Sequence, residues 1–145
     1  MTNDLRFDEP LLRAAWDVRS LAYAPYSSFS VGAAVRTESG RVFVGVNVEN
    51  ASYGLTVCAE RVAIFAAIAA GERVILSVAV VTAATSVTPP CGACRQVIFE
   101  FGSDARIFAA NLTDARAIWT VQELLPHAFG PTSLTNSSYD RDSSD

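Results

Sequence analysis

The sequence predicts a layered α/β domain with a mixed β-sheet. Two β-rich runs, residues 29–37 and 41–49, are joined by the short loop "ESG", which is typical of a β-hairpin. After this hairpin, helical and strand-like segments alternate along the chain, as they do in layered α/β domains. The chain has 145 residues, of which 50% are hydrophobic, and this is enough material for a single domain with its own core.

The first two predicted helices differ in polarity. Residues 10–23 carry interspersed apolar and charged side chains that suit an amphipathic helix, and Pro10 favours a first helical turn. Residues 57–71 are rich in alanine and end at Gly71, a common residue just after a helix. The middle of this second helix, "VAIFAAIAA", is apolar on every side. It must therefore be covered all round, by the sheet, by neighbouring helices or by another subunit.

The second half of the chain continues the alternation. Residues 74–84 form a nearly continuous apolar run rich in β-branched residues, which predicts a strand in the middle of the sheet, buried on both faces. Residues 91–102 predict a helix, and residues 105–112 predict a further strand. A short last helix begins at residue 121 and is expected to stop at Pro126.

Composition argues against two classes of partner. The formal net charge is −4, and an acidic surface repels phosphate backbones, so we expect no nucleic-acid partner. No apolar run reaches the roughly 18 to 20 residues of a membrane span, and the first residues, "MTNDLRFDEP", lack the features of a signal peptide. We therefore expect a cytoplasmic protein with no membrane partner. Residues 132–145 are polar, Ser-rich and acidic, which predicts a disordered tail.

The three cysteines lie in two short motifs. "PCGAC" holds Cys91 and Cys94, and "CAE" holds Cys58. By its spacing alone, the first pair suits a redox site, a structural metal site or a catalytic site. Disulfides are rare in a reducing compartment, which weakens the redox interpretation. Both motifs lie at predicted helix starts, where the positive helix end stabilises thiolates, and three thiolates match a catalytic zinc that keeps its fourth position for water.

Glu60, two residues after Cys58, adds a group that can transfer protons. A carboxylate at this place is suited to take a proton from a zinc-bound water and to return it to a leaving group. A zinc ligand, a Glu two residues later and a "PCxxC" motif together form the pattern of zinc-dependent base deaminases. The simpler alternative is an acidic residue that only stabilises the start of a helix.

Four blocks of the sequence carry a family resemblance: "YAPYSSFSVGAAV" at 23–35, "GVNVENASYGLTVCAER" at 45–61, "PCGACRQV" at 90–97 and "ELLPHAF" at 123–129. In order and spacing they resemble the small, homotetrameric, three-cysteine class of cytidine deaminases. The resemblance implies a three-layer α/β/α fold whose mixed central sheet has about five strands. It also implies a catalytic domain over residues 1–131 and a homotetramer with active sites at the subunit interfaces.

The resemblance further implies a zinc site and a reaction. Cys58, Cys91 and Cys94 would bind one Zn²⁺ per subunit, with water in the fourth position. Glu60 would move protons between that water, the ring nitrogen and the departing amine. The implied reaction is the hydrolytic deamination of cytidine and 2′-deoxycytidine to uridine and 2′-deoxyuridine with release of ammonia, a step of pyrimidine salvage.

The same resemblance implies where a small-molecule nucleoside would bind. Asn47 and Glu49 would hold the ribose hydroxyls. Phe29 would pack on the pyrimidine ring, and the backbone of Ala59 would hold the edge of the base. Phe129 would close the site of a neighbouring subunit. Without the family, Asn47 and Glu49 also suit strand-end turns, and the two phenylalanines suit the core.

Three residues are expected to support the zinc site. Arg61 and Arg95 are candidates to donate hydrogen bonds to the cysteine sulfurs and so offset the negative charge that three thiolates leave around Zn²⁺. Gln96 is expected to add a further polar contact. The chain departs from the family at two positions, because glycine is usual in place of His127 and threonine is common in place of Val62.

Two other functions stay open at this point. A related deaminase acting on blasticidin S or on 4-substituted pyrimidine nucleosides would use the same site. A non-catalytic interaction module held together by structural zinc would have a closed fourth position, which His127 is a candidate to fill, and would leave Glu60 without a role.

Overall fold

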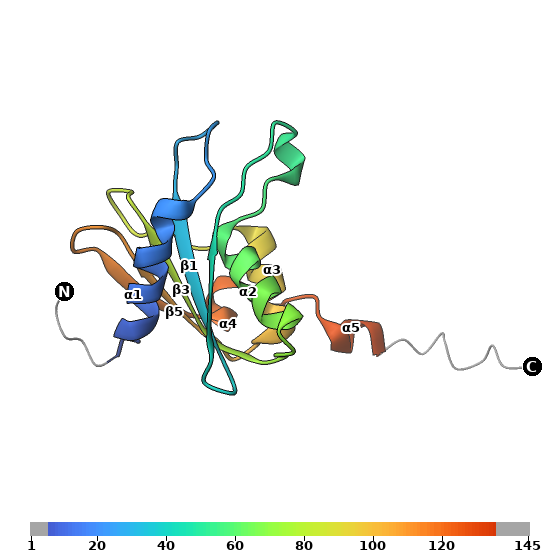
Figure 1. Ribbon diagram of the computed structural model, residues 1–145. Helices are drawn as coiled ribbons and strands as arrows, with labels where there is room; N and C mark the ends of the chain where they lie inside the picture. The colour runs from blue at the N-terminus through green and yellow to red at the C-terminus, as the bar shows by residue number, and fades with distance from the viewer. Residues whose placement is uncertain (1–5, 136–145) are drawn as a thin grey trace, which may run out of the picture.

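The computed structural model of the protein describes residues 6–135 and shows one five-stranded sheet with helices on both faces (Figure 1). In chain order the elements are α1 (Glu9–Val18), the 3₁₀ turn η1 (Arg19–Leu21), β1 (Val31–Thr37), β2 (Val42–Val46), the 3₁₀ turn η2 (Tyr53–Leu55), α2 (Ala59–Ala69), β3 (Ile75–Thr82), α3 (Gly92–Phe101), β4 (Arg106–Ala110), β5 (Arg116–Thr120), α4 (Val121–Leu124) and α5 (Pro131–Thr135).

The strands are ordered β2-β1-β3-β4-β5 across the sheet. β1 and β2 form the predicted antiparallel hairpin, with Gly32 opposite Val46 and Arg36 opposite Val42. β3 pairs antiparallel with β1 and parallel with β4, so it lies in the middle, as its continuous apolar run predicts. β5 pairs antiparallel with β4 at the far edge. The mixed sheet and the α/β/α layers are therefore confirmed.

The residue patterns predict four of these strands and miss β5. Its residues, Arg116–Thr120, are only partly buried, so they form no continuous apolar run. The strand follows a tight turn in which Asn111 Oδ1 accepts hydrogen bonds from the backbone N–H groups of Thr113 and Ala115, each at 3.0 Å. One buried asparagine thus folds the chain back onto β4, and the pairing partner rather than the local sequence makes this segment a strand.

The terminal helices differ in length from the prediction. α1 ends at Val18, and the chain continues as the turn η1 through Leu21. The last predicted helix is reduced to α4, whose start is fixed by a capping box of Thr120 and Glu123. Helix α5 takes up residues 131–135, at the beginning of the predicted tail, and residues 136–145 lie outside the described residues. None of the helices within residues 6–135 is long and apolar enough to cross a lipid bilayer.

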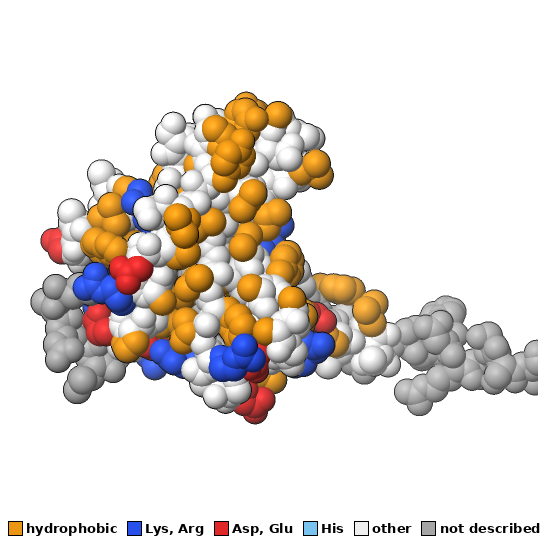
Figure 2. Space-filling view, viewed as in Figure 1, with side chains coloured by type: hydrophobic (Ala, Val, Ile, Leu, Met, Phe, Trp, Pro, Cys, Tyr) orange, Lys and Arg blue, Asp and Glu red, His pale blue; other side chains and the backbone are white. Residues whose placement is uncertain are grey.

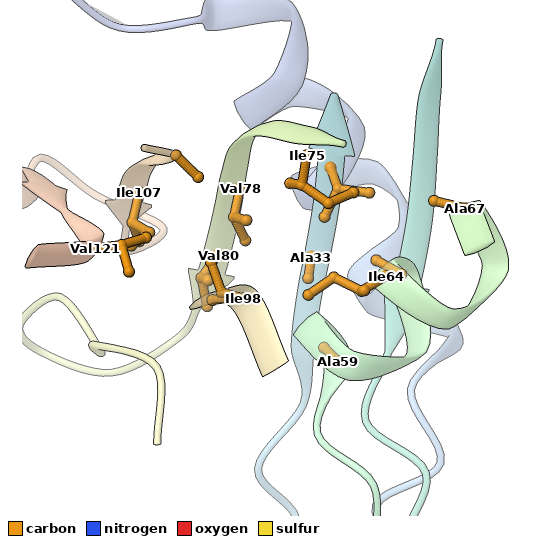
Figure 3. Packing of buried hydrophobic residues seen from close by; sticks show 13 residues of the cluster. Ala33, Ala59, Ile64, Ala67, Ile75, Val78, Val80, Ile98, Ile107 and Val121 are labelled. Carbon is orange, nitrogen blue, oxygen red and sulfur yellow. The ribbon is translucent and has the colours of Figure 1, made fainter. Parts of the chain in front are cut away.

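Hydrophobic clusters fill both faces of the sheet. On one face, Val78 of β3 belongs to a cluster with Ile64 of α2 and Ile98 of α3 (Figure 3). On the other face, Ala79 of β3 belongs to a cluster with Leu11 of α1. Successive residues of β3 therefore enter opposite cores, which explains why this strand is apolar over most of its length.

Helix α2 approaches strand β2 closely at Gly45. A Cβ atom at this position would lie 2.4 Å from the Ala63 nitrogen and 2.5 Å from the Ala59 carbonyl oxygen. Only glycine allows the two backbones to come so near. This close approach fixes α2 against the hairpin, and with it the position of its first turn, where Glu60 lies.

Candidate metal centre and active site

Three cysteine sulfurs meet where helices α2 and α3 begin. Cys58 is the N-cap residue of α2, Cys91 is the N-cap residue of α3, and Cys94 lies in the first turn of α3. The three Sγ atoms lie within 4.8 Å of one another, and those of Cys58 and Cys91 are 3.7 Å apart. The two motifs converge because α2 and α3 lie side by side on the same face of the sheet (Figure 1).

The donor set and its spacing fit a tetrahedral zinc ion. Two sulfurs that each lie about 2.3 Å from such an ion are about 3.8 Å apart, close to the separation of Cys58 and Cys91. All three thiols are free, and two of them cap helix N-termini, where a thiolate is stabilised. Among the divalent metals that proteins bind, zinc is one that prefers thiolate ligands.

The thiols of Cys58 and Cys94 do not ionise equally. A hydrogen bond from Cys94 lowers the pKa of Cys58, and hydrogen bonds from Arg61 and Cys91 add to this effect against the opposing effect of burial. The pKa of Cys94 is raised by the same hydrogen bond to Cys58 and by burial. Of these two residues, Cys58 therefore becomes a thiolate, the form that binds a metal, more readily than Cys94.

Arg61 lies against the sulfurs, where the sequence predicts it. Its Nη2 atom donates to Cys58 Sγ at 3.6 Å, and hydrogen bonding to Cys58 raises the pKa of Arg61. Its Nε atom is buried and has no hydrogen-bond partner among the described residues. A buried N–H group without an acceptor is costly, and thiolates that bind a metal would supply negative charge beside this one. The environment of Arg61 therefore also fits a metal held by thiolates.

Glu60 is buried next to these sulfurs, with 4% of its surface exposed. Burial raises the pKa of Glu60, and the negative charge of Cys58 raises it further. A carboxyl group whose pKa is raised exchanges protons more readily near neutral pH, as a general acid and base must. Its environment therefore distinguishes Glu60 from an ordinary acidic residue at a helix start.

A cavity of about 260 Å³ opens beside the cysteines and collects most of the predicted site residues. Its lining includes two metal-ligand candidates and five residues predicted to bind substrate or transfer protons: Cys58, Cys91, Phe29, Asn47, Glu49, Ala59 and Glu60. These residues come from the loop before β1, the segment after β2 and the first turns of α2 and α3. The tertiary fold thus joins four separate stretches of sequence in one site.

Asn47 and Glu49 each make more than one contact in the cavity wall. Asn47 Oδ1 accepts a hydrogen bond from the Val31 N–H at 2.8 Å, and its Nδ2 donates to the Phe29 carbonyl at 2.7 Å. Glu49 accepts hydrogen bonds from the backbone N–H of Tyr26 and from both the N–H and the hydroxyl of Ser27. Hydrogen bonding to Ser27 lowers the pKa of Glu49, so this carboxylate is ionised at neutral pH.

Sequence reasoning missed Ser27. Its hydroxyl donates to Glu49 and accepts a hydrogen bond from the Phe29 N–H at 3.0 Å. The sequence offers one weak signal, because "YSS" directly precedes Phe29. Serine is common in loops, however, and its contact with Glu49 spans 22 positions of the chain, which no local pattern predicts.

The predicted hydrogen bond from Arg95 to a sulfur is wrong. Arg95 Nε donates to the Pro90 carbonyl at 2.8 Å, and Nη1 donates to the Leu124 carbonyl at 2.9 Å. Gln96 makes the expected polar contact, but with the chain rather than with the metal site, because its Nε2 donates to the Phe129 carbonyl at 2.8 Å. Both side chains therefore tie α3 to neighbouring backbone segments, and Arg95 supports the residue just before Cys91.

Phe129 lies apart from the cavity of its own chain. Its side chain is 62% exposed and is not in the cavity wall. His127, two residues earlier, has a φ of 52°, a left-handed conformation that favours glycine. This explains why glycine suits the position, whereas nothing in the structure explains why valine replaces threonine at Val62. His127 is exposed and does not join the three cysteines, so the described residues do not form a closed Cys₃His site.

Comparisons with known proteins agree with this site. Residues 5–110 match the family described as "Cytidine and deoxycytidylate deaminase zinc-binding region". A cytidine deaminase of Halalkalibacterium halodurans is 48% identical over 120 residues, which cover 82% of this chain and 91% of the relative. The chain belongs to the cytidine deaminase family. The resemblance of the four sequence blocks is thereby confirmed, and the family's zinc-binding region together with the cysteine cluster indicates one zinc ion per subunit.

Solved structures of cytidine deaminases share the fold as well. The enzyme of Burkholderia pseudomallei is 47% identical and superposes with a TM-score of 0.82, covering 85% of this chain and 99% of its own. The cytidine deaminase of Mycobacterium tuberculosis is 42% identical with a TM-score of 0.73, covering 86% of this chain and 98% of its own. The five-stranded sheet and its helices are thus those of the cytidine deaminase family.

Proposed function

We propose that this protein is a zinc-dependent enzyme that hydrolyses cytidine and 2′-deoxycytidine to uridine and 2′-deoxyuridine with release of ammonia. One observation carries the proposal: the buried Glu60 lies beside three metal-binding sulfurs in a cavity that Asn47 and Glu49 also line. A structural zinc module has no use for a buried carboxyl group or for a cavity at its metal. The names of the relatives support the same reaction.

The chain's own residues supply the proton transfers. Zinc, when bound by Cys58, Cys91 and Cys94, supplies a water molecule that ionises near neutral pH. In the overall reaction a C4–O bond forms, the C4–N bond breaks, and both protons of the water move to nitrogen. Glu60 carries the first proton to the ring nitrogen N3 and the second to the departing amine. Its raised pKa suits both the acceptance and the release of a proton.

Other residues in the cavity would hold the nucleoside. The ionised carboxylate of Glu49 accepts hydrogen bonds, so it suits a sugar hydroxyl as donor. Asn47 offers its remaining amide hydrogen to the same sugar, and the Phe29 ring would pack on the pyrimidine. The backbone of Ala59, at the start of α2, would hold the edge of the base.

The charge of the cavity supports a nucleoside rather than a nucleotide. Among the described residues that line this cavity and the adjoining one at Tyr26, Tyr53 and Thr56, none is lysine or arginine, whereas Glu49 and Glu60 are acidic. A 5′-phosphate would therefore meet no cationic side chain among these described lining residues and would be repelled. We expect much weaker turnover of the 5′-monophosphates than of the free nucleosides.

We also propose a homotetramer whose sites lie at subunit interfaces. Large hydrophobic side chains are exposed on the two loops that project above the sheet (Figure 2), among them Tyr26, Tyr53 and Leu55. Phe65 on α2 is 48% exposed, although it lies in the middle of the helix, which is apolar on every side. Apolar surface of this extent favours burial against further copies of the chain.

A cytoplasmic location and a role in pyrimidine salvage complete the proposal. Three free thiols that must bind zinc are maintained most readily in a reducing compartment. The proposed products, uridine and 2′-deoxyuridine, are nucleosides that salvage reactions consume.

Conversion of cytidine, followed by ultraviolet absorbance, tests the reaction. We expect the wild type to bind one zinc per subunit and to convert cytidine, and Glu60→Gln to keep its zinc while kcat falls about 10³-fold. Glu100→Gln, which changes an exposed residue of α3, is the matched control and should behave as wild type. If wild type and Glu60→Gln both bind zinc but neither converts any pyrimidine nucleoside, the enzyme proposal fails. A wild type that prefers blasticidin S to cytidine would overturn the choice of substrate.

A further inference from the structure

The carboxylate of Glu49 is held by a single loop. Three donors contact it: the Tyr26 N–H at 2.9 Å and the Ser27 N–H at 3.1 Å to Oε1, and the Ser27 hydroxyl to Oε2. An ionised carboxylate offers about four acceptor positions, so this loop occupies most of them. The loop therefore sets the direction of the acceptor position that remains for a ligand.

Among these donors, only the Ser27 hydroxyl belongs to a side chain. The two backbone donors both contact Oε1, so the hydroxyl is the one contact that holds Oε2. Without it, the carboxyl group keeps its anchor at Oε1 and is free to rotate about that end. The hydroxyl therefore determines the plane of the carboxylate.

The hydroxyl of Ser27 is itself oriented by the next turn of the loop. The Phe29 N–H donates to Ser27 Oγ at 3.0 Å, and it occupies a lone pair of this oxygen. The hydroxyl hydrogen is then directed to Glu49. Asn47 Nδ2 in turn donates a hydrogen bond to the Phe29 carbonyl at 2.7 Å. Ser28, which lies between Ser27 and Phe29, has a φ of 56°, and this conformation lets the backbone make a tight turn. The conformation of the loop thus fixes the orientation of the Ser27 hydroxyl.

We propose that Ser27 is a positioning residue that aligns the Glu49 carboxylate for the ribose hydroxyls of the substrate. This inference rests on the proposed function, and it adds a residue to which no sugar or base contact is assigned. Ser27 acts through Glu49, so its loss weakens recognition of the sugar and leaves the proton transfers at Glu60 in place.

The test compares two substrates in Ser27→Ala. We expect the KM for cytidine to rise about tenfold, with kcat changed less than about threefold, because a charge-assisted hydrogen bond that orients Glu49 is lost. The KM for 2′,3′-dideoxycytidine, which lacks the 2′- and 3′-hydroxyls of the sugar, should change less than about twofold. A structural role alone would change the KM values for both substrates equally, whereas a positioning role would raise the KM for cytidine far more than the KM for the dideoxy analogue.

Two further variants sharpen the test. Ser27→Thr keeps a hydroxyl and should retain a KM for cytidine within about threefold of wild type. Ser30→Ala removes another hydroxyl of the same loop, one that makes no hydrogen bond among the described residues, and should match wild type. An equal rise in KM for both substrates in Ser27→Ala, or no rise for either, would overturn the role of Ser27. A wild type inactive on cytidine would instead contradict the proposed function.

Discussion

Glu60 shows how tertiary burial changes the chemistry of a single residue. Its place in the first turn of a helix is one where an acidic side chain is common and where the helix dipole favours the charged form. In the folded chain, burial and the neighbouring Cys58 oppose ionisation and raise the pKa of Glu60. The motif locates the residue, and its surroundings make it suited to carry protons.

His127 adopts a left-handed backbone conformation that is unfavourable for a residue with a Cβ atom. Its φ of 52° is uncommon for any residue except glycine and costs free energy in a side chain with a Cβ atom. We expect His127→Gly to raise the free energy of unfolding by about 1 kcal/mol, measured by urea unfolding at a fixed protein concentration.

His127→Ala is the control for that substitution, because it removes the imidazole and keeps the Cβ atom. We expect it to give no gain in stability. Equal stabilisation by glycine and alanine would show that the imidazole, rather than the backbone, is the source of the effect.

Among the secondary-structure elements, α2 matters most to the site, because its first turn carries Glu60 and follows Cys58. The helix itself is evident from its alanine-rich sequence. Its place is set by Gly45 of β2, which a reader of the sequence would assign only to a strand. The contact of a helix backbone with a strand backbone is a property of two elements together, and neither segment predicts it alone.

Gly45→Ala tests this contact. The added Cβ atom would lie 2.4 Å from the Ala63 nitrogen, so α2 must move outward. We expect the free energy of unfolding to fall by about 3 kcal/mol, with lower zinc content and lower activity, because the first turn of α2 moves with the helix. Differential scanning calorimetry and metal analysis measure the two effects.

Gly54→Ala provides the comparison for Gly45→Ala. A Cβ atom at Gly54 meets nothing within 4 Å, so its stability and zinc content should stay close to wild type. Similar losses in the two variants would contradict the proposed importance of the α2–β2 contact.

At the scale of the whole molecule, Phe129 is the residue whose role depends on assembly. It is exposed and absent from the cavity of its own chain, and Gln96 holds its carbonyl at 2.8 Å. The neighbouring Gly130 packs against Phe99, where a Cβ atom would lie 2.5 Å from that ring. The segment is therefore held to α3 in a position that presents the Phe129 ring outward.

A mixture of two weakly active variants tests whether Phe129 acts on a neighbouring subunit. We expect Glu60→Gln and Phe129→Ala to be weakly active alone and to regain about a quarter of wild-type activity when coexpressed in equal amounts, because random mixing pairs an intact Glu60 with an intact Phe129 in about one site of four. Native mass spectrometry should show mixed tetramers.

The control for this mixture is Glu60→Gln with Cys58→Ser, since both residues belong to one subunit's site and mixing cannot restore it. Mixed tetramers without recovered activity in the Phe129→Ala pair would show that Phe129 does not complete a neighbouring site.

Much of this protein follows from its sequence alone. Local patterns predict the hairpin, the buried central strand, the two helices and the three cysteines with Glu60. In such patterns, spacing along the chain determines which side chains share a helix start or a strand face. The edge strand β5 escaped this reasoning because Asn111 and the partner strand β4 create it.

Only the tertiary structure decided which groups those side chains meet. Arg95 stands next to a zinc-ligand candidate in the sequence, yet it donates to the carbonyls of Pro90 and Leu124. Ser27 is an ordinary loop serine until the fold brings Glu49 to it. The physical reason is that hydrogen-bond partners and pKa values depend on distances of a few ångströms between segments far apart in the chain, and sequence spacing does not contain those distances.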